Sequence, residues 1–343
     1  PGSSMPRHTE RKGTRMRLGV LDVGSNTVHL LLLDVYPGSR PEAFASHKDS
    51  LRLVRYLDDA GRISDEGRDA LTSFVIEARD FAAEHGADDL LAFATSAIRE
   101  AGNGAAVLDH VQSRSGVTLT EIAGDQEAAV TFSAVRRWFG WGAGTILDLD
   151  IGGGSFEMAI GHDGLPAAAV STPLGAGRLT QSFLTRHPAI PSEVRALRKH
   201  VRRTLEPAVE TILGQGSPDL VVGTSKTFRS LARICGAAPS GAGQFVRRTM
   251  HLEDLRLWTR RMEAMSAQER SDLPGVSAHR AEQVLAGGIA AETAMDMLGA
   301  ATLVICPWAL REGLILRRMD RLGADPETVL NPPQSLIGRE VPA

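Results

Sequence analysis

The sequence has little cysteine, no long apolar run and no large excess of charge. Its 343 residues include only two cysteines, Cys235 and Cys306, far apart and in apolar surroundings. A disulfide framework is therefore excluded, and free buried thiols in a reducing compartment are expected. No apolar run approaches the roughly 20 residues of a membrane-spanning helix. The N-terminus also lacks a signal-peptide pattern, so a cytoplasmic protein that does not bind membranes is predicted.

The charge balance argues against a general nucleic-acid binder. The formal net charge is -3, whereas proteins that bind nucleic acids are usually basic. A hydrophobic content of 43% and a charged content of 23% are typical of a globular protein. A chain of 343 residues is too long for most single cores, so two domains are expected.

Both ends of the chain are predicted to lie outside the folded part. The opening letters PGSSM are typical of a tag remnant, and the basic, polar stretch RHTERKGTR follows them. Residues 1–15 are therefore interpreted as a tag and a disordered N-terminus. Residues 323–343 contain four prolines and are interpreted as a tail.

The chain nearly repeats itself once. LDVGSNTVHLL at residues 21–31 and DLDIGGGSFEMAIG at residues 148–161 each place a small-residue turn between two apolar strands. Asp22 and Asp150, at matching places in the two stretches, are 128 positions apart. This interval is too long for a solenoid repeat and suits a duplicated domain.

Strand–helix alternation follows each hairpin and predicts an α/β architecture of two lobes. The N-terminal lobe is expected over residues 16–138 and the C-terminal lobe over residues 139–322, with a cleft between them. Glycines cluster at residues 139–144, where a hinge between the lobes is predicted. The final helix is expected to return to the first lobe.

Shorter patterns predict several individual elements. Phe44–Val54 is predicted as a third strand, and residues 118–123 as a later strand of the first lobe. Ser64 is predicted to cap a helix that ends near His85. Asp125 is predicted to cap the last helix of this lobe.

Each repeated turn carries residues that turn geometry does not explain. A hairpin turn accounts for the glycines, because its central residues often have positive φ. It does not account for Asp22 and Asp150, which end apolar strands two residues before each turn. A buried carboxylate there is costly unless a cation compensates it. Thr27 and Ser155 follow the turns, and backbone amides beside hydroxyls suit phosphate oxygens. The pattern therefore favours a metal–phosphate site.

Five stretches, in order along the chain, resemble those of known families. The two turns resemble the first and second phosphate motifs of the actin-like ATPase superfamily. With FATSAIRE (93–100), AGDQEA (123–128) and CPWALREGLIL (306–316), they resemble the exopolyphosphatase and guanosine pentaphosphate phosphohydrolase (Ppx/GppA) family. The likeness runs from about Arg17 to Arg318. It implies two ribonuclease H-like lobes in the short, two-domain form, and it is compatible with a homodimer.

The resemblance implies a catalytic pair. Glu127 matches the family's catalytic glutamate and would orient or deprotonate the attacking water. Arg99 would grip the terminal phosphate, because a guanidinium matches phosphate oxygens bidentately. Without the resemblance, a helix-face glutamate and a surface arginine are the simpler interpretations. Gln126 stands where the family often has a glutamate, so metal binding would be weaker or would depend on Asp150 and Glu157.

The expected metal is Mg²⁺, with Mn²⁺ as an alternative. Mg²⁺ commonly takes one or two carboxylates together with phosphate oxygens. Asp150 would bind it directly or through water, and Glu157 would bind metal or position water. Asp22 is the counterpart in the first lobe, with turn stabilisation as its alternative role. The residues predicted to bind substrate are Gly24, Ser25, Asn26, Thr27, Gly152, Gly153, Gly154, Ser155 and Lys226.

Lys226 departs from the superfamily pattern. VGTSKTFRSLA, residues 222–232, occupies the place of the adenosine motif, where glycine is common at the position of Lys226. A lysine there would crowd a base but could pair with a phosphate, although a solvent-exposed lysine at a helix start is an equal alternative. Further basic residues that could line a channel are Arg178, Arg229, Arg247 and Arg248.

Four functions follow from these patterns. The expected one is a Mg²⁺-dependent exopolyphosphatase that releases orthophosphate from the ends of inorganic polyphosphate. Hydrolysis of pppGpp to ppGpp uses the same phosphoanhydride chemistry and stays open. A regulator that binds (p)ppGpp or polyphosphate with little turnover is the third, and Gln126 lends it support. An actin-like kinase or ATPase is disfavoured because the adenosine motif is altered.

Overall fold

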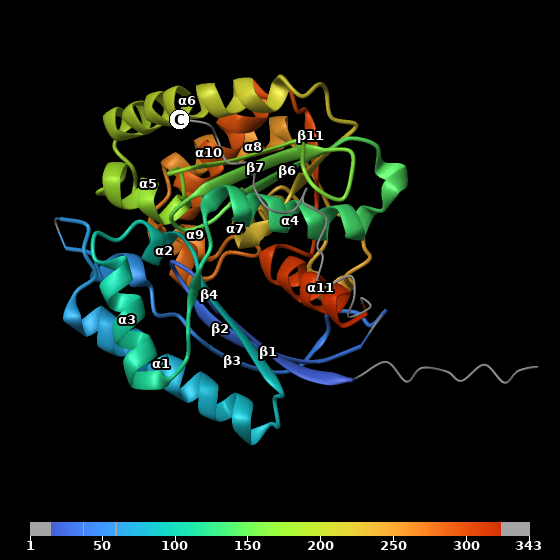
Figure 1. Cartoon of the computed structure of the whole chain (residues 1–343). Helices are drawn as coiled ribbons and strands as arrows, with labels where there is room; N and C mark the ends of the chain where they lie inside the picture. Colours follow the sequence, from blue (N-terminus) through green and yellow to red (C-terminus); the bar gives the residue numbers. More distant parts are fainter. Residues whose placement is uncertain (1–14, 37, 59, 324–343) are drawn as a thin grey trace, which may run out of the picture.

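The structure, a computed structural model, describes residues 15–36, 38–58 and 60–323. The predicted tag and tail lie outside these residues, apart from Arg15 and Gly323. Two β-sheets with helices around them make up the described part (Figure 1). None of its helices is long and apolar enough to cross a membrane.

The first lobe is built on a five-stranded sheet that begins with the predicted hairpin. In the order β3-β2-β1-β4-β5, β1 runs antiparallel to β2 and parallel to β4. The strands are β1 (Met16–Val23), β2 (Val28–Val35), β3 (Ala43–Asp49), β4 (Asp89–Ala94) and β5 (Thr120–Glu121). Helices α1 (Asp65–Glu84) and α3 (Gly104–Ser115) bury one face of the sheet. The predicted cap of α1 is confirmed, because Ser64 Oγ accepts a hydrogen bond from the Gly67 amide.

The second lobe repeats this topology in a six-stranded sheet. In the order β10-β11-β9-β6-β7-β8, β6 runs antiparallel to β7 and parallel to β9. The strands are β6 (Ile146–Ile151), β7 (Phe156–Gly161), β8 (Ala168–Thr172), β9 (Leu220–Gly223), β10 (Thr249–His251) and β11 (Thr302–Ile305). The helices of its outer core are α5 (Ala176–Phe183), α6 (Pro191–Leu213), α7 (Ser225–Ile234), α8 (Leu252–Glu263) and α10 (Val284–Met297). Asp22 and Asp150 therefore occupy equivalent positions, next to the last residues of β1 and β6.

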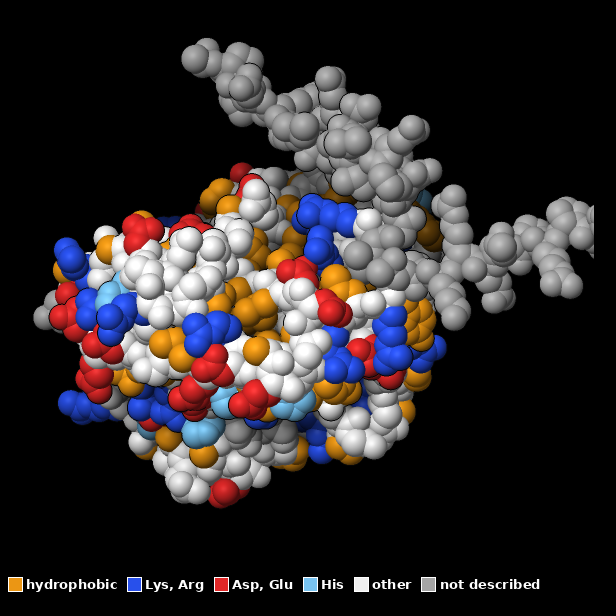
Figure 2. Space-filling view, turned by 60° about the horizontal axis from the view of Figure 1, so that its bottom comes forward, with side chains coloured by type: hydrophobic (Ala, Val, Ile, Leu, Met, Phe, Trp, Pro, Cys, Tyr) orange, Lys and Arg blue, Asp and Glu red, His pale blue; other side chains and the backbone are white. Residues whose placement is uncertain are grey.

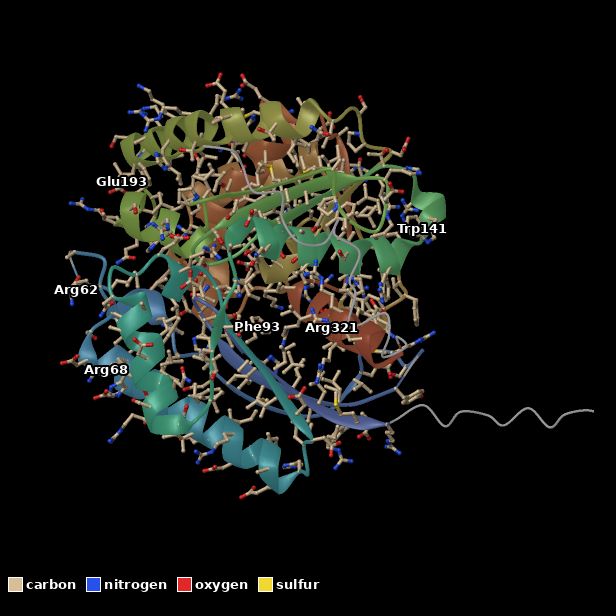
Figure 3. All side chains as sticks on the ribbon, in the orientation of Figure 1. Arg62, Arg68, Phe93, Trp141, Glu193 and Arg321 are labelled. Carbon is tan, nitrogen blue, oxygen red and sulfur yellow. The ribbon has the colours of Figure 1, made fainter. Side chains whose placement is uncertain are left out.

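Two helices from distant parts of the chain fill the space between the sheets (Figure 1). They are α4 (Gly124–Phe139) and α11 (Leu310–Gly323). Phe132 of α4 is buried with residues of the second sheet. Ile315 of α11 is buried with residues of α4 and of the first sheet, including Phe93, which is labelled in Figure 3. The final helix thus packs against the first sheet, and α4 contributes to both cores.

Three predicted elements differ from the structure. The predicted strand Phe44–Val54 ends at Asp49, and a 3₁₀ turn (Leu53–Tyr56) follows Arg52, whose left-handed φ of 52° breaks an extended backbone. The predicted strand at residues 118–123 is reduced to β5, two exposed residues at the sheet edge. Asp125 is not a cap. Ala123 is the N-cap residue of α4, and Asp125 lies in its first turn, where its charge favours the helix N-terminus.

Two short helices and the edge strand β10 are absent from the sequence prediction. The two helices are α2 (Ser96–Arg99) and α9 (Ala267–Ser271). A 3₁₀ turn over Ala278–Arg280 precedes α10. The short helix α2 matters for the site, because it carries Arg99.

Charged side chains of both signs are interspersed on the face shown in Figure 2. Over the described residues, charged side chains form ion pairs such as Arg68 with Asp65 at 2.7 Å and Arg202 with Asp296 at 2.8 Å. The mixture agrees with the net charge of -3. Exposed pairs of this kind contribute little to stability.

Candidate active site

The two repeated turns face each other across the lobes. The first loop closes with a hydrogen bond from the Gly24 amide to the Thr27 carbonyl (3.1 Å), and the second with one from the Gly152 amide to the Ser155 carbonyl (2.9 Å). A methyl group added to Gly153 would lie 2.7 Å from Nδ2 of Asn26. The two loops therefore lie against each other, and the polar region where they meet, with the side chains around it, is called the cleft below.

The reason predicted for the loop glycines is wrong. No residue of loops 24–27 and 152–155 has a positive φ. Instead, the second loop needs glycine because the first lobe lies against it. A methyl group added to Gly154 would lie 2.7 Å from Ser96 Oγ and 3.2 Å from Ser25 Oγ. Side chains at Gly153 or Gly154 would push the lobes apart.

A pair of amides holds the first loop to the second lobe. Asn26 Nδ2 donates to Gln283 Oε1 (3.1 Å), and Gln283 Nε2 donates to Asn26 Oδ1 (3.2 Å). Gln283 immediately precedes α10. Nothing in the local sequence marks it, because its partner lies 257 positions away along the chain.

Asp22 and Asp150 are acidic groups inside the cleft. Burial raises the pKa of Asp22 to about 6, opposed by Arg311 and reinforced by Glu312 and Asp150. Burial also raises the pKa of Asp150, although Thr224 donates a hydrogen bond to its Oδ2 (2.8 Å). Arg311 Nε lies 3.7 Å from Asp22 Oδ2. Burial disfavours the ionised form of both carboxyls, and a bound cation would favour that form.

Glu127 and Arg99, which the resemblance predicts as a catalytic pair, contact each other. Arg99 Nη1 donates to Glu127 Oε2 (3.1 Å) and to the Ile122 carbonyl (2.7 Å). Each side chain is 16% exposed. Burial raises the pKa of Glu127 to about 7, although Arg99 opposes the shift. A carboxylate with a pKa near neutrality is suited to accept a proton from water.

Glu157 lies beside this pair. Its Oε1 accepts a hydrogen bond from Ser171 Oγ (2.8 Å) and lies 4.0 Å from Arg99 Nη2. Burial, and then the charge of Glu127, raise the pKa of Glu157 well above its ordinary value. In the described ranges, no three His, Cys, Asp or Glu side chains form a group that could bind a metal. Asp22, Asp150 and Glu157 therefore do not form a complete metal site by themselves.

Basic side chains gather near Asp150. Lys226 is exposed in the first turn of α7, as the alternative interpretation expects. Desolvation and the nearby charges of Arg229, Arg280 and Lys48 lower its pKa. Burial, and then Arg229, lower the pKa of Arg280 to about 10. Of the predicted channel residues, Arg229 belongs to this group. Lys48 and Arg280 were not predicted, because they lie outside the motifs and reach the site only through the fold.

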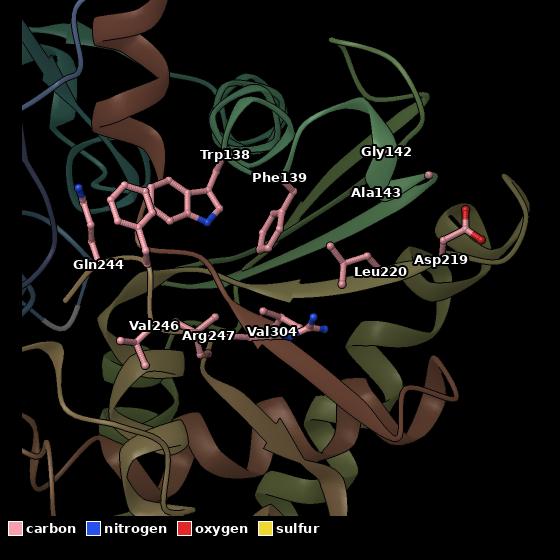
Figure 4. Close-up of a pocket in the computed structure, with 13 residues that line it drawn as sticks. Trp138, Phe139, Gly142, Ala143, Asp219, Leu220, Gln244, Val246, Arg247 and Val304 are labelled. Atoms are coloured by element: carbon pink, nitrogen blue, oxygen red, sulfur yellow. The ribbon is translucent and has the colours of Figure 1, made fainter. Parts of the chain in front are cut away.

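Arg247 and Arg248 lie elsewhere. Arg248 donates to backbone carbonyls of its own segment, including that of Ala238 (2.9 Å). Arg247 lines a cavity of about 750 Å³ together with Trp138 and Asp219 (Figure 4). Asp219 precedes β9, so this cavity lies at the opposite end of the sheet from the loop after β6. This large cavity is therefore not the phosphate site.

Two further polar groups, His29 and Asp148, lie near the aspartates, and only Asp148 was overlooked in the sequence. Arg311 Nη1 donates to His29 Nδ1 (2.6 Å), and burial lowers the pKa of His29 to about 4. Asp148 is 2% exposed, its Oδ1 has no hydrogen-bond partner among the described residues, and burial raises its pKa well above its ordinary value. Strand alternation puts Asp148 on the same face as Asp150, which is the one sequence signal that could have singled it out.

The duplicated α/β fold and this polar cleft define an enzyme that acts on phosphate groups. The chain belongs to the Ppx/GppA phosphatase family, which it matches over residues 33–322. The predicted fold class, family and enzyme class are thereby confirmed.

Comparison with individual proteins supports the same assignment. The chain is 50% identical to exopolyphosphatase 1 of Mycobacterium leprae over 305 residues, which cover 89% of this chain and 90% of that protein. It is 51% identical to exopolyphosphatase 1 of Mycobacterium tuberculosis, with 89% of each chain covered. A solved exopolyphosphatase structure from Cytophaga hutchinsonii has the same fold, with a TM-score of 0.79, 24% identity, and coverage of 89% of this chain and 98% of that one.

The buried carboxyls predict how stability changes with pH. Asp22 and Glu127 have folded-state pKa values of about 6 and about 7, above their values of about 4 in an unfolded chain. The folded protein therefore holds more protons, and stability is lost as the pH rises from about 4 through about 7. In EDTA, the melting temperature is expected to fall by about 2–5 °C between pH 5 and pH 8. Circular dichroism at both pH values would measure it. Glu127→Gln should reduce the fall, whereas an equal fall in this variant would contradict the assignment.

Proposed function

We propose that the protein is an exopolyphosphatase that removes orthophosphate from the ends of inorganic polyphosphate. The observation that carries the proposal is the contact between Arg99 and Glu127 at the edge of two phosphate loops. It occurs in a chain that is half identical to proteins named exopolyphosphatase 1. Hydrolysis of a terminal phosphoanhydride bond needs a positioned water, neutralised charge and in-line geometry, and the cleft offers groups for each.

Asp22 and Asp150 fit a divalent metal that binds together with the substrate. Both carboxyls have pKa values raised by burial, and Asp150 raises the pKa of Asp22 further. A bound cation would therefore offset the free-energy cost of ionising two buried, neighbouring carboxyls. Two carboxylates plus phosphate oxygens suit Mg²⁺, and Mn²⁺ is the alternative. When bound, the metal would neutralise charge on the phosphate oxygens. Glu157, held by Ser171 beside Arg99, is better placed to position water than to bind metal with the two aspartates.

The remaining steps belong to side chains of the chain itself. Glu127 would accept a proton from the attacking water while the oxygen of that water attacks the terminal phosphorus. The bond from this phosphorus to the bridging oxygen would break, which releases orthophosphate and leaves a chain one unit shorter. Arg99 would orient Glu127 and contact the terminal phosphate. The amides and hydroxyls of the loops at 24–27 and 152–155 would bind the units on either side of the broken bond.

The basic group beside Asp150 favours polyphosphate over a guanosine nucleotide. Lys226 and Arg229 belong to the segment that resembles the superfamily's adenosine motif, and Arg280 lies near both. Positive charges at this place suit further phosphate units better than a flat, uncharged ring. Gln126, which stands where the family often has a glutamate, is exposed. The absence of a carboxylate there therefore does not change the acidity of the cleft, so a regulator with little turnover is less favoured.

Phosphate release from purified protein tests the proposal. With Mg²⁺, kcat/KM on polyphosphate should exceed that on pppGpp by at least about tenfold, and EDTA should abolish release. Release from pppGpp alone would transfer the assignment to pppGpp hydrolysis. Binding of either compound without metal-dependent release would identify a regulator.

A further inference from the structure

Two groups of charged side chains lie near Asp150. One is basic: the charges of Arg229 and Arg280 act on Asp150, Lys226 lies near both, and these cations would attract the body of a polyphosphate chain. The other contains Glu127, whose carboxyl lies near the charges of Arg99 and Asp150. The internal units of a bound chain would therefore extend toward the three cations, with the terminal phosphate at Arg99.

Behind Arg99, side chains from both lobes meet. Arg178 of α5 forms an ion pair with Glu100, which follows α2. Arg178 Nε also donates to the Gly154 carbonyl (3.1 Å), which ties it to the second phosphate loop. The Glu100 carboxylate lies 3.9 Å from Arg99 Nη2. A continuous series of contacts thus runs from Glu127 through Arg99 and Glu100 to Arg178.

The space next to this ion pair is small. Ser25 Oγ and Ser96 Oγ are 3.0 Å apart and buried, and Gly154 lies against both. Glu100 and Arg178 line a cavity of about 140 Å³ together with these three residues, and they are its only charged lining residues in the described part. A phosphate chain passing Arg99 would meet the Glu100 carboxylate, while the charge of Arg178 is already neutralised. Entry in this direction is opposed by the charge of Glu100.

We propose that the Arg178–Glu100 ion pair closes the cleft behind the terminal phosphate and thereby restricts cleavage to chain ends. A chain that cannot extend past Arg99 can place only its last phosphoanhydride bond at Glu127. This inference rests on the proposed exopolyphosphatase function and assigns its end specificity to two residues outside the catalytic pair.

The test uses chains that have no free ends. Polyphosphate with both terminal phosphates blocked as phosphoramidates is compared with free polyphosphate of the same length, by gel and by orthophosphate release. The wild-type protein should act on free chains and be at least about a hundredfold slower on blocked ones. The double variant Arg178→Ala, Glu100→Ala should cut blocked chains internally into shorter polyphosphates. Its ratio of the rate on free chains to the rate on blocked chains should be at least about tenfold smaller than that of the wild type.

Two further variants keep the result interpretable. Exchange of the charges, as Arg178→Glu with Glu100→Arg, should restore resistance of blocked chains if the ion pair is the barrier. Arg202→Ala removes an arginine from an exposed ion pair away from the cleft and should behave as wild type. If the double alanine variant does not fold, Glu100→Gln alone decides the matter, since it removes the repelling charge with little change in shape.

The outcomes separate the two proposals. If wild-type protein releases no orthophosphate from free chains, the proposed function fails. If it does, but the folded alanine variant or Glu100→Gln still leaves blocked chains intact, the ion pair is not the barrier and the inference is overturned. Internal cleavage by wild-type protein would also overturn it.

Discussion

Replacing Glu127 by glutamine is expected to lower kcat on polyphosphate by about 10²- to 10⁴-fold, the range for loss of a general base. Glutamine keeps the shape of the side chain but cannot accept a proton from water. Because Arg99 would still find an oxygen acceptor near 3.1 Å, substrate binding should change little. Steady-state kinetics with Mg²⁺ in excess would separate kcat from KM.

The matched control for this variant is Asp125→Asn, two residues earlier on α4. Asp125 is exposed and lies in the first turn of the same helix, so its loss removes the same charge without entering the cleft. It should keep activity within about twofold, as expected for an exposed site. If Glu127→Gln keeps more than about a tenth of wild-type kcat, Glu127 does not act as the general base.

Asp150→Asn is expected to raise the Mg²⁺ concentration required for half-maximal activity by at least about a hundredfold. The asparagine keeps an oxygen to accept the hydrogen bond from Thr224 but lacks the charge that a divalent cation requires. Titration with Mn²⁺, followed by electron paramagnetic resonance in the presence of a slowly hydrolysed phosphate analogue, would measure metal binding without turnover. The loss should be in metal affinity, and saturating metal should recover part of the rate.

Asp163→Asn provides the comparison for Asp150→Asn. Asp163 is an exposed aspartate in the connection between β7 and β8, so it controls for loss of one negative charge from the same lobe. Its metal dependence should equal that of the wild type. Unchanged metal dependence in Asp150→Asn would mean that this carboxylate has a structural role and that the metal lies elsewhere.

Much of the fold could be predicted because its signals are local. Each hairpin carries its own alternation of apolar strand and small-residue turn, and Ser64 caps α1 from three residues away. The predicted strand at residues 118–123 failed because an edge strand gains little from its own sequence, and only Thr120 and Glu121 pair with β4. Arg52 ended another predicted strand early through a backbone angle that an arginine rarely adopts.

The site, like the fold, contains some residues that local sequence patterns reveal and others that they do not. Glu127, Arg99, Asp22 and Asp150 lie within contiguous motifs, and the structure places all four in one cleft. Their detailed roles stay predictions until tested. Gln283 and Arg280 come from the last quarter of the chain and lie outside the motifs, and each reaches its site partners, Asn26 and Asp150, only through the fold. Their importance is tertiary, so no local pattern could reveal it.

The loop glycines show how a correct residue can have a wrong explanation. The turn pattern predicts glycine at 152–154 for its backbone freedom, but Gly153 and Gly154 adopt ordinary angles and are crowded by Asn26 and Ser96. The constraint comes from the opposite lobe, which a turn pattern cannot represent. Substitution at these positions should therefore affect lobe approach before it affects the hairpin.

The place of α11 between the sheets has a consequence for protein synthesis. The first sheet is complete by Glu121, yet Leu18, Val20 and Phe93 are buried partly by Ile315 and Leu316. At about 5–20 residues per second, the ribosome needs roughly ten to forty seconds to travel from α4 to α11. During that interval the nascent first lobe would expose an apolar face to solvent. A chaperone that binds such faces would have its longest opportunity there, and truncations before Leu310 should aggregate.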